Sequence, residues 1–348
     1  MEYDVYCVLR VQLKYMCLHI IIPNRVKGVR DEPYLRVEHD AAKLRPPDDS
    51  SGLELHQASC RGELDEVKRL TEEKKLNPLQ KDKIMTLFFT MQQLNIMKYF
   101  IDEMGLVPAC LGWTGQTPLH RAAYERHLEL VRYLVAEQQV DPLCQDEYGH
   151  TPLYHACGGG DIDVVRYLVK EMNKYIPHKD VVYERTKHGD SPIHYAAGNG
   201  YLQIVKLFIS ELNCDPNIRG QWGRTPLHGA AQEGKLDIVK YLIEKLKCNP
   251  SHLDERDVTP LHLASGKGQL NVMKYLAQYK VCKPLCRNKN HNTPLHYAAQ
   301  DGRLEVVNYL IEILKCPPNV RGHCNMTPLE LARSQGHTHV VQYLMSIV

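Results

Sequence analysis

The amino-acid sequence predicts an all-α repeat solenoid, in which each unit is a helix–turn–helix pair followed by a projecting hairpin or finger loop. The first observation is the motif Thr-Pro-Leu-His at Thr225–His228, which returns at Thr259 and at Thr293, each time after 34 residues. The second is that a further complete copy begins at Thr117, and that looser copies begin at Thr151, Ser191 and Thr327. A fixed period of this size is typical of units that stack on their neighbours.

Each motif carries the local signals of a helix pair. Thr225 is a good N-cap, and Pro226 suits the first helical turn, where its missing N–H costs nothing. Ala230 and Ala231 are small enough to let a second helix approach, and Gly234 is placed to end the first helix. The apolar stripe of the second helix is then predicted to contain Leu236, Ile238, Val239, Tyr241 and Leu242.

A third observation supports the finger loop. The position two residues before each motif threonine or serine holds glycine or a residue that tolerates positive φ. These residues are Gly115, Gly149, Gly189, Gly223, Asp257, His291 and Asn325. We therefore predict a left-handed backbone at this position in every unit.

The motif Thr-Pro-Leu-His-x-Ala resembles the signature of the ankyrin-repeat family. The resemblance covers residues 53–348 and implies about nine repeats and a non-enzymatic protein-binding role. Most units have 34 residues where the family usually has 33. The units are expected to start near residues 53, 83, 117, 151, 191, 225, 259, 293 and 327.

Two units depart from the pattern. The unit near residue 83 has Phe88 and Phe89 where small alanines are expected, which predicts a splayed helix pair. The unit at 151–190 carries six extra residues between about Tyr175 and Val182. An insertion in a finger region commonly falls on the binding side of such an array.

Residues 1–45 precede the repeats and are followed by a Pro- and Asp-rich linker at 46–52. The apolar run from Val5 to Ile22 fits both a strand and a helix, and it contains too many polar residues to span a bilayer comfortably. Acidic Glu2 and Asp4 stand where a secretory signal would be basic. This segment either caps the array or is part of another domain.

The composition argues against a protein recruited to nucleic acid or membranes by its overall charge, and against one cross-linked by its periodic cysteines. The net charge of +2 provides no global field for nucleic acid or membranes. Of the 12 cysteines, four recur at the repeat period: Cys214, Cys248, Cys282 and Cys316. Neighbouring repeats lie about 8–10 Å apart, too far for a disulfide, so we expect small buried thiols and a reducing compartment, the cytoplasm or the nucleus.

The recurring histidines and glycines do not predict a catalytic, metal or cofactor site. The motif histidines occur once per repeat, about 8–10 Å apart, and metal ligands must converge on one ion. They are interpreted as helix-start residues with local hydrogen bonds. The glycines at 158–160 and 265–268 lack the order of a phosphate loop and lie where the first helix ends.

The variable residues predict the binding surface. In this family the partner usually meets the finger tips and the exposed end of the first helix. At those positions the later repeats hold eight Lys or Arg residues against Asp190 and Glu255, and Trp222 and Trp113 add aromatic anchors. The predicted protein-binding residues are Tyr124, Tyr148, Arg185, Lys187, Arg219, Trp222, Arg224, Arg256 and Lys289.

The sequence therefore predicts a monomeric, non-catalytic scaffold that binds an acidic or mixed-charge protein segment, without a cofactor, small-molecule substrate or nucleic acid. A different hypothesis is that the chain is the ankyrin arm of a larger enzyme or signalling protein. Reversing the charge of Arg219 and Arg224 is expected to weaken partner binding and to leave the helical content unchanged.

Overall fold

The computed structural model describes residues 50–73, 94–108 and 114–347. Two compact units are present, Met1–Thr90 and Met91–Val348. The predictions for residues 1–45, for the phenylalanines at 88 and 89 and for Trp113 lie outside the described residues. The described residues are helical, with turns between the helices and no β-strand, as an all-α repeat solenoid requires.

The first unit contains one described helix pair. α2 (Ser50–Arg61) packs against α3 (Leu64–Glu73), and the connecting Gly62 has a φ of 78°. Leu55 and Leu70 are buried in this pair. α2 begins at Ser50, so the last residues of the expected linker are helical.

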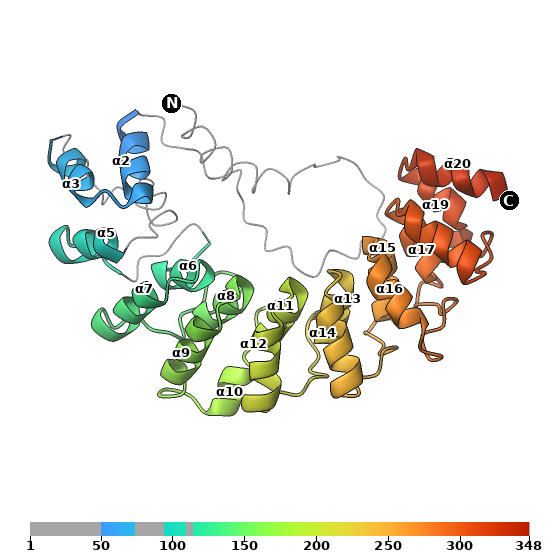
Figure 1. Cartoon of the computed structure of the whole chain (residues 1–348), viewed down its shortest axis with the longest axis horizontal. Helices are drawn as coiled ribbons and strands as arrows, with labels where there is room; N and C mark the ends of the chain where they lie inside the picture. The colour runs from blue at the N-terminus through green and yellow to red at the C-terminus, as the bar shows by residue number, and fades with distance from the viewer. Residues whose placement is uncertain (1–49, 74–93, 109–113, 348) are drawn as a thin grey trace. The chain divides into compact units, whose positions relative to one another are not determined.

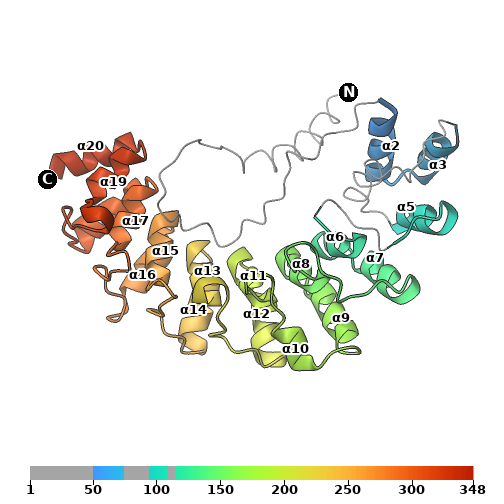
Figure 2. The ribbon, with the colours of Figure 1, turned by 180° about the vertical axis from the view of Figure 1, so that it is seen from behind.

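The second unit is a row of helix pairs, which Figures 1 and 2 show following one another in chain order from α6 to α20. Each first helix packs on the first helix of the next repeat, and several second helices also contact the second helix of the next repeat. The first helices are α6 (Pro118–Tyr124), α8 (Pro152–Gly159), α11 (Pro192–Asn199), α13 (Pro226–Gln232), α15 (Pro260–Lys267), α17 (Pro294–Gln300) and α19 (Pro328–Ser334). The second helices are α5 (Leu94–Lys98), α7 (Leu128–Arg132), α9 (Ile162–Met172), α12 (Leu202–Lys206), α14 (Leu236–Lys240), α16 (Leu270–Ala277), α18 (Leu304–Asn308) and α20 (Thr338–Ile347).

The second helices contain a feature that the sequence analysis did not predict. Several continue as π-helices, in which one turn holds one more residue than an α-turn. In the repeat that begins at Thr225, the N–H of Leu246 donates to the carbonyl of Tyr241, five residues earlier. These π turns occur in 34-residue repeats, but the fully described 34-residue repeat that begins at Thr259 has none. The π turns are η2 (Tyr99–Glu103), η3 (Tyr133–Glu137), η4 (Leu207–Glu211), η6 (Tyr241–Lys245) and η7 (Tyr309–Ile313).

The finger loops, the segments between a second helix and the next motif threonine, are hydrogen-bonded turns. In the loop before Thr151, the N–H of Asp146 donates to the carbonyl of His150, and the N–H of Gly149 donates to the carbonyl of Asp146. The predicted left-handed position is confirmed in every loop, with φ between 59° and 91°. Short 3-10 turns, η5 (Gln221–Gly223) and η8 (His323–Asn325), occupy two of these loops.

The six-residue insertion forms an additional short helix, α10 (His178–Val182), which lies beside α12 in both views (Figures 1 and 2). Val181 and Val182 are fully buried, whereas Tyr175 is 66% exposed. Part of the insertion therefore extends the core, and its role in binding stays a prediction. Among the described helices, none combines the length and the apolar character needed to cross a bilayer.

Candidate functional site

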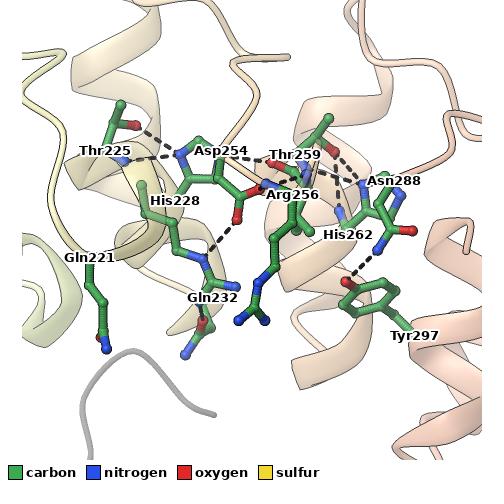
Figure 3. Close-up of polar contacts among 12 residues, drawn as sticks. Gln221, Thr225, His228, Gln232, Asp254, Arg256, Thr259, His262, Asn288 and Tyr297 are labelled. Atoms are coloured by element: carbon green, nitrogen blue, oxygen red, sulfur yellow. Dashed lines mark hydrogen bonds and ion pairs between the residues drawn. The ribbon is translucent and has the colours of Figure 1, made fainter. Parts of the chain in front are cut away.

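The motif histidines are part of the scaffold, as predicted, and they also join each first helix to the finger loop at the end of the same unit. The Nδ1 atom of His228 accepts hydrogen bonds from the N–H (3.2 Å) and hydroxyl (2.9 Å) of Thr225 (Figure 3). Its Nε2 atom donates to the carbonyl of Val258, at the end of the next finger loop (3.1 Å). Burial, followed by the nearby Arg224 charge, lowers the pKa of His228 to about 3. The ring is therefore neutral at pH 7.

The same geometry recurs along the array, since His262 donates to the carbonyl of Asn292 and His296 to that of Met326. The local half of this network was predictable from the motif. The half that reaches the finger loop at the end of the unit was not, because its partners are 30 residues apart. Both ring nitrogens of these histidines are occupied by scaffold contacts.

The recurring cysteines are buried as predicted, and each is 2–4% exposed. Burial raises the pKa of the Cys248 and Cys316 thiols to about 11. These thiols are therefore protonated at neutral pH and fill space between repeats.

The centre of the predicted surface is Trp222, in the finger loop before Thr225. Its backbone is left-handed, with a φ of 54° and a ψ of 24°, inside the short turn η5. The guanidinium carbons of Arg224 and Arg256 each lie 4.8 Å from the ring centroid. Trp222 therefore makes cation–π contacts with two arginines from successive finger loops.

The structure corrects the expected exposure of Arg224. The side chain is fully buried, and its Nε atom donates to Oδ2 of Asp254 at 3.1 Å. The other carboxylate oxygen of Asp254 accepts from the N–H groups of Arg256 and Val258, both at 2.8 Å. Arg224 therefore balances a buried carboxylate and adds no charge to the surface.

The arginines six residues before a motif residue connect successive finger loops. Nη1 of Arg185 donates to the carbonyls of Gly189 (2.6 Å) and Arg219 (2.5 Å). Nη1 of Arg287 donates in the same way to the carbonyl of Arg321, at 2.9 Å. These side chains are exposed, but part of their donor capacity is used within the array.

Arg219 is also exposed, and its Nη2 atom lies 3.0 Å from Nε2 of His252. A guanidinium can only donate, so this nitrogen of His252 is the acceptor. Desolvation, and after it the charge of Arg219, lowers the pKa of His252.

Lys187 and Lys289 are exposed at equivalent positions of two finger loops. Their backbone N–H groups donate to the carbonyls of Tyr148 and Arg256 in the preceding loops, both at 2.9 Å. Within the described part of the chain, neither ammonium group has an ion pair. We call the set Arg185, Lys187, Arg219, Trp222, Arg256 and Lys289 the basic finger surface.

Tyr124 and Tyr148 belong to a different group of side chains. Tyr148 stacks on His150, with ring centroids 5.6 Å apart, and Tyr124 lies edge-on to His155 at 6.4 Å. The two histidines share the carboxylate of Asp146. This group was not predicted from the sequence, although the motif at Thr151 reads Thr-Pro-Leu-Tyr-His and places the histidine one position later.

The comparisons agree with the repeat architecture. A family model described as "Ankyrin repeats (3 copies)" matches residues 55–146, 136–220, 199–285 and 279–347. These ranges overlap at their ends and together extend from residue 55 to residue 347. A comparison with curated proteins found no match.

Proposed function

Because the chain belongs to the ankyrin-repeat family, we propose that it is a non-catalytic scaffold that binds an acidic or mixed-charge segment of a partner protein on the basic finger surface. Ankyrin repeats are generally protein–protein interaction modules. For this chain we propose, in addition, that the basic finger surface is the binding site and that the partner segment is acidic or of mixed charge.

The observation that carries the proposal is the contact of Trp222 with Arg224 and Arg256. A half-buried indole held by two guanidinium groups offers a rigid apolar anchor that loses little conformational entropy on binding. Tryptophan and arginine are the residues enriched at the energetic centres of interfaces. The position of Trp222 in a turn fixed by left-handed backbone gives the anchor a defined orientation.

Charge determines the class of partner. Lys187 and Lys289 display positive charge that no described residue pairs, and Arg219 and Arg256 lie in the two finger loops between them. A partner with acidic side chains would approach such a row faster and in a preferred orientation. The array therefore favours an acidic segment over an uncharged one.

Affinity purification with quantitative mass spectrometry tests the proposal. The baits are the full chain, W222A, the charge-reversed variant K187E/K289E and the control K170E/K245E. The control makes the same change of charge at exposed lysines of second helices. Proteins bound through the basic finger surface should be captured by the wild type and the control, and lost from W222A and K187E/K289E.

Direct binding of a purified captured protein then gives the magnitude. Removing a central anchor of this kind costs about 2 kcal/mol, or roughly 30-fold in Kd. Binding should also weaken as salt rises. Equal capture by all four baits would contradict the proposed surface.

We also propose that the protein acts as a monomer in the cytoplasm or the nucleus. The support for the compartment is the row of buried, protonated thiols, which suits a reducing environment. A fluorescent fusion of the full chain, imaged in cells, would test the location.

A further inference from the structure

A buried cluster of Asp146, His150 and His155 lies outside the basic finger surface. Nδ1 of His150 and Nε2 of His155 lie 3.1 Å and 3.2 Å from the same carboxylate oxygen, Oδ2 of Asp146. The side chain of Asp146 is fully buried, and those of His150 and His155 are 7% and 4% exposed. The ligand atoms of these three side chains all lie within 4.8 Å of one another, close enough to hold one metal ion.

The carboxylate is held rigidly by its own finger loop. Its second oxygen, Oδ1, accepts from the backbone N–H groups of Tyr148 and His150, both at 2.9 Å. The imidazole of His150 is stacked on Tyr154, with centroids 4.4 Å apart and an interplanar angle of 8°. The backbone of the finger loop therefore fixes the Asp146 carboxylate, and the stacked ring of Tyr154 fixes the His150 imidazole, before any ligand binds.

Asp254 stands at the position of Asp146 in a later repeat, and the comparison shows that the cluster lacks a balancing arginine. Asp254 is paired with Arg224, which stands 30 residues earlier. The residue 30 positions before Asp146 is Gln116, whose amide is neutral. Its Nε2 atom is buried and has no hydrogen-bond partner among the described residues. The arginine that balances the charge of Asp254 therefore has no counterpart here.

The two histidines are also departures from the repeat. The position of His155 holds Tyr195 and Tyr297 in other repeats, and the position of His150 holds Gln116 and Asp190. Asn288 and Tyr297 stand at the positions of Asp146 and His155 in a later repeat, and they are joined by a neutral hydrogen bond of 2.9 Å. The scaffold does not need imidazoles or a carboxylate here, so this donor set requires another explanation.

We propose that Asp146, His150 and His155 form a binding site for one divalent metal ion of the zinc type. Tetrahedral zinc binds imidazole nitrogen and carboxylate oxygen at about 2.0–2.2 Å, which places neighbouring ligand atoms about 3.3 Å apart. The two separations from Oδ2 of Asp146 are already close to that value. Two imidazoles with one carboxylate form a donor set that suits zinc better than magnesium or calcium.

Binding requires each coordinating nitrogen to present a lone pair. The proton of each neutral imidazole then resides on the other ring nitrogen, and Asp146 supplies the negative charge. The ion would join the finger loop that holds Asp146 and His150 to α8, the first helix of the next repeat, which carries His155. The site is thus a structural clip between two successive repeats.

Zinc binding by the full chain tests the proposal. The protein is treated with a chelator, dialysed, and titrated with zinc chloride by calorimetry, and bound zinc is counted by mass spectrometry. The variant D146N/H155Y copies the neutral pair of Asn288 and Tyr297. The control H252Q replaces a histidine outside the cluster. Wild type and H252Q should bind one more zinc ion per chain than D146N/H155Y.

Cobalt(II) distinguishes this site from adventitious binding by cysteines. The wild type should give visible ligand-field bands that D146N/H155Y lacks, without a thiolate-to-cobalt charge-transfer band. If D146N/H155Y does not fold, H150Q, which copies Gln116, serves in its place. Equal zinc stoichiometry in wild type and variant, or a spectrum dominated by thiolate, would overturn the proposal and leave an imidazolium as the charge that balances Asp146.

Discussion

Arg224 and Asp254 form an ion pair in which both side chains are fully buried, with 3.1 Å between Nε and Oδ2. The two residues belong to successive finger loops and are 30 positions apart. The pair therefore holds two repeats together, and Trp222 contacts the guanidinium of Arg224.

Replacing Arg224 by methionine should destabilise the array strongly, because it leaves the Asp254 charge buried without its guanidinium. A change of this kind costs about 3–5 kcal/mol. Urea unfolding followed by circular dichroism measures it. R224M/D254N should recover part of the loss, since the asparagine keeps Oδ1 for the two backbone N–H groups. The half-exposed Arg256 provides the control variant, R256M. Equal urea midpoints for R224M and R256M would refute the prediction.

Acid should destabilise the protein through His228. The folded-state pKa is about 3 and the ordinary value is 6.5, so below pH 6.5 the unfolded state binds a proton that the native state does not. Stability therefore falls as the pH drops, by up to about 1.4 kcal/mol per pH unit. H228Q keeps an acceptor for the Thr225 N–H, as Glu330 does for Thr327. Between pH 6.5 and 5 the wild type should lose about 2 kcal/mol more than H228Q, and parallel pH profiles would exclude this role.

Glu184 should produce a pH dependence of opposite sign. Desolvation raises its pKa from 4.5 to about 7, although the Thr151 hydroxyl donates to Oε2 at 3.0 Å. Between these values the native state keeps a proton that the unfolded state has released, so stability falls as the pH rises. E184Q should remove a loss of about 2–3 kcal/mol between pH 5 and 7.5. Urea midpoints across this range, with exposed E211Q as the control, measure it. An E184Q profile as steep as the wild type would disprove it.

Gly220 should not tolerate a side chain. A Cβ atom there would lie 2.1 Å from Oδ1 of Asp190 and 2.9 Å from Nε2 of His194. Asp190 accepts from the Gln221 N–H at 2.9 Å, so it cannot move without losing that bond. G220A should cost about 1–3 kcal/mol by thermal unfolding. A double-mutant cycle with D190A should show coupling, and strict additivity of the two changes would argue against this contact.

Most of the fold was predictable from the sequence because its signals are local. The threonine cap, the proline in the first turn and the left-handed position before each motif depend on residues at most a few positions apart. The binding surface was only partly predictable. Lys187 and Lys289 are exposed as finger residues should be, but Arg224, in a similar sequence context, is buried. Its environment depends on Asp254, in the next repeat.

The sequence by itself determined the repeat period, the helix pairs and the positions of positive φ, because these follow from backbone preferences within each unit. The tertiary structure decided which polar side chains face solvent and which face a neighbouring repeat. It also decided that several second helices continue as π turns, and that Asp146, His150 and His155 converge. The physical reason is that stacking brings together residues about 30 positions apart, and burial at that contact determines their charge and partners.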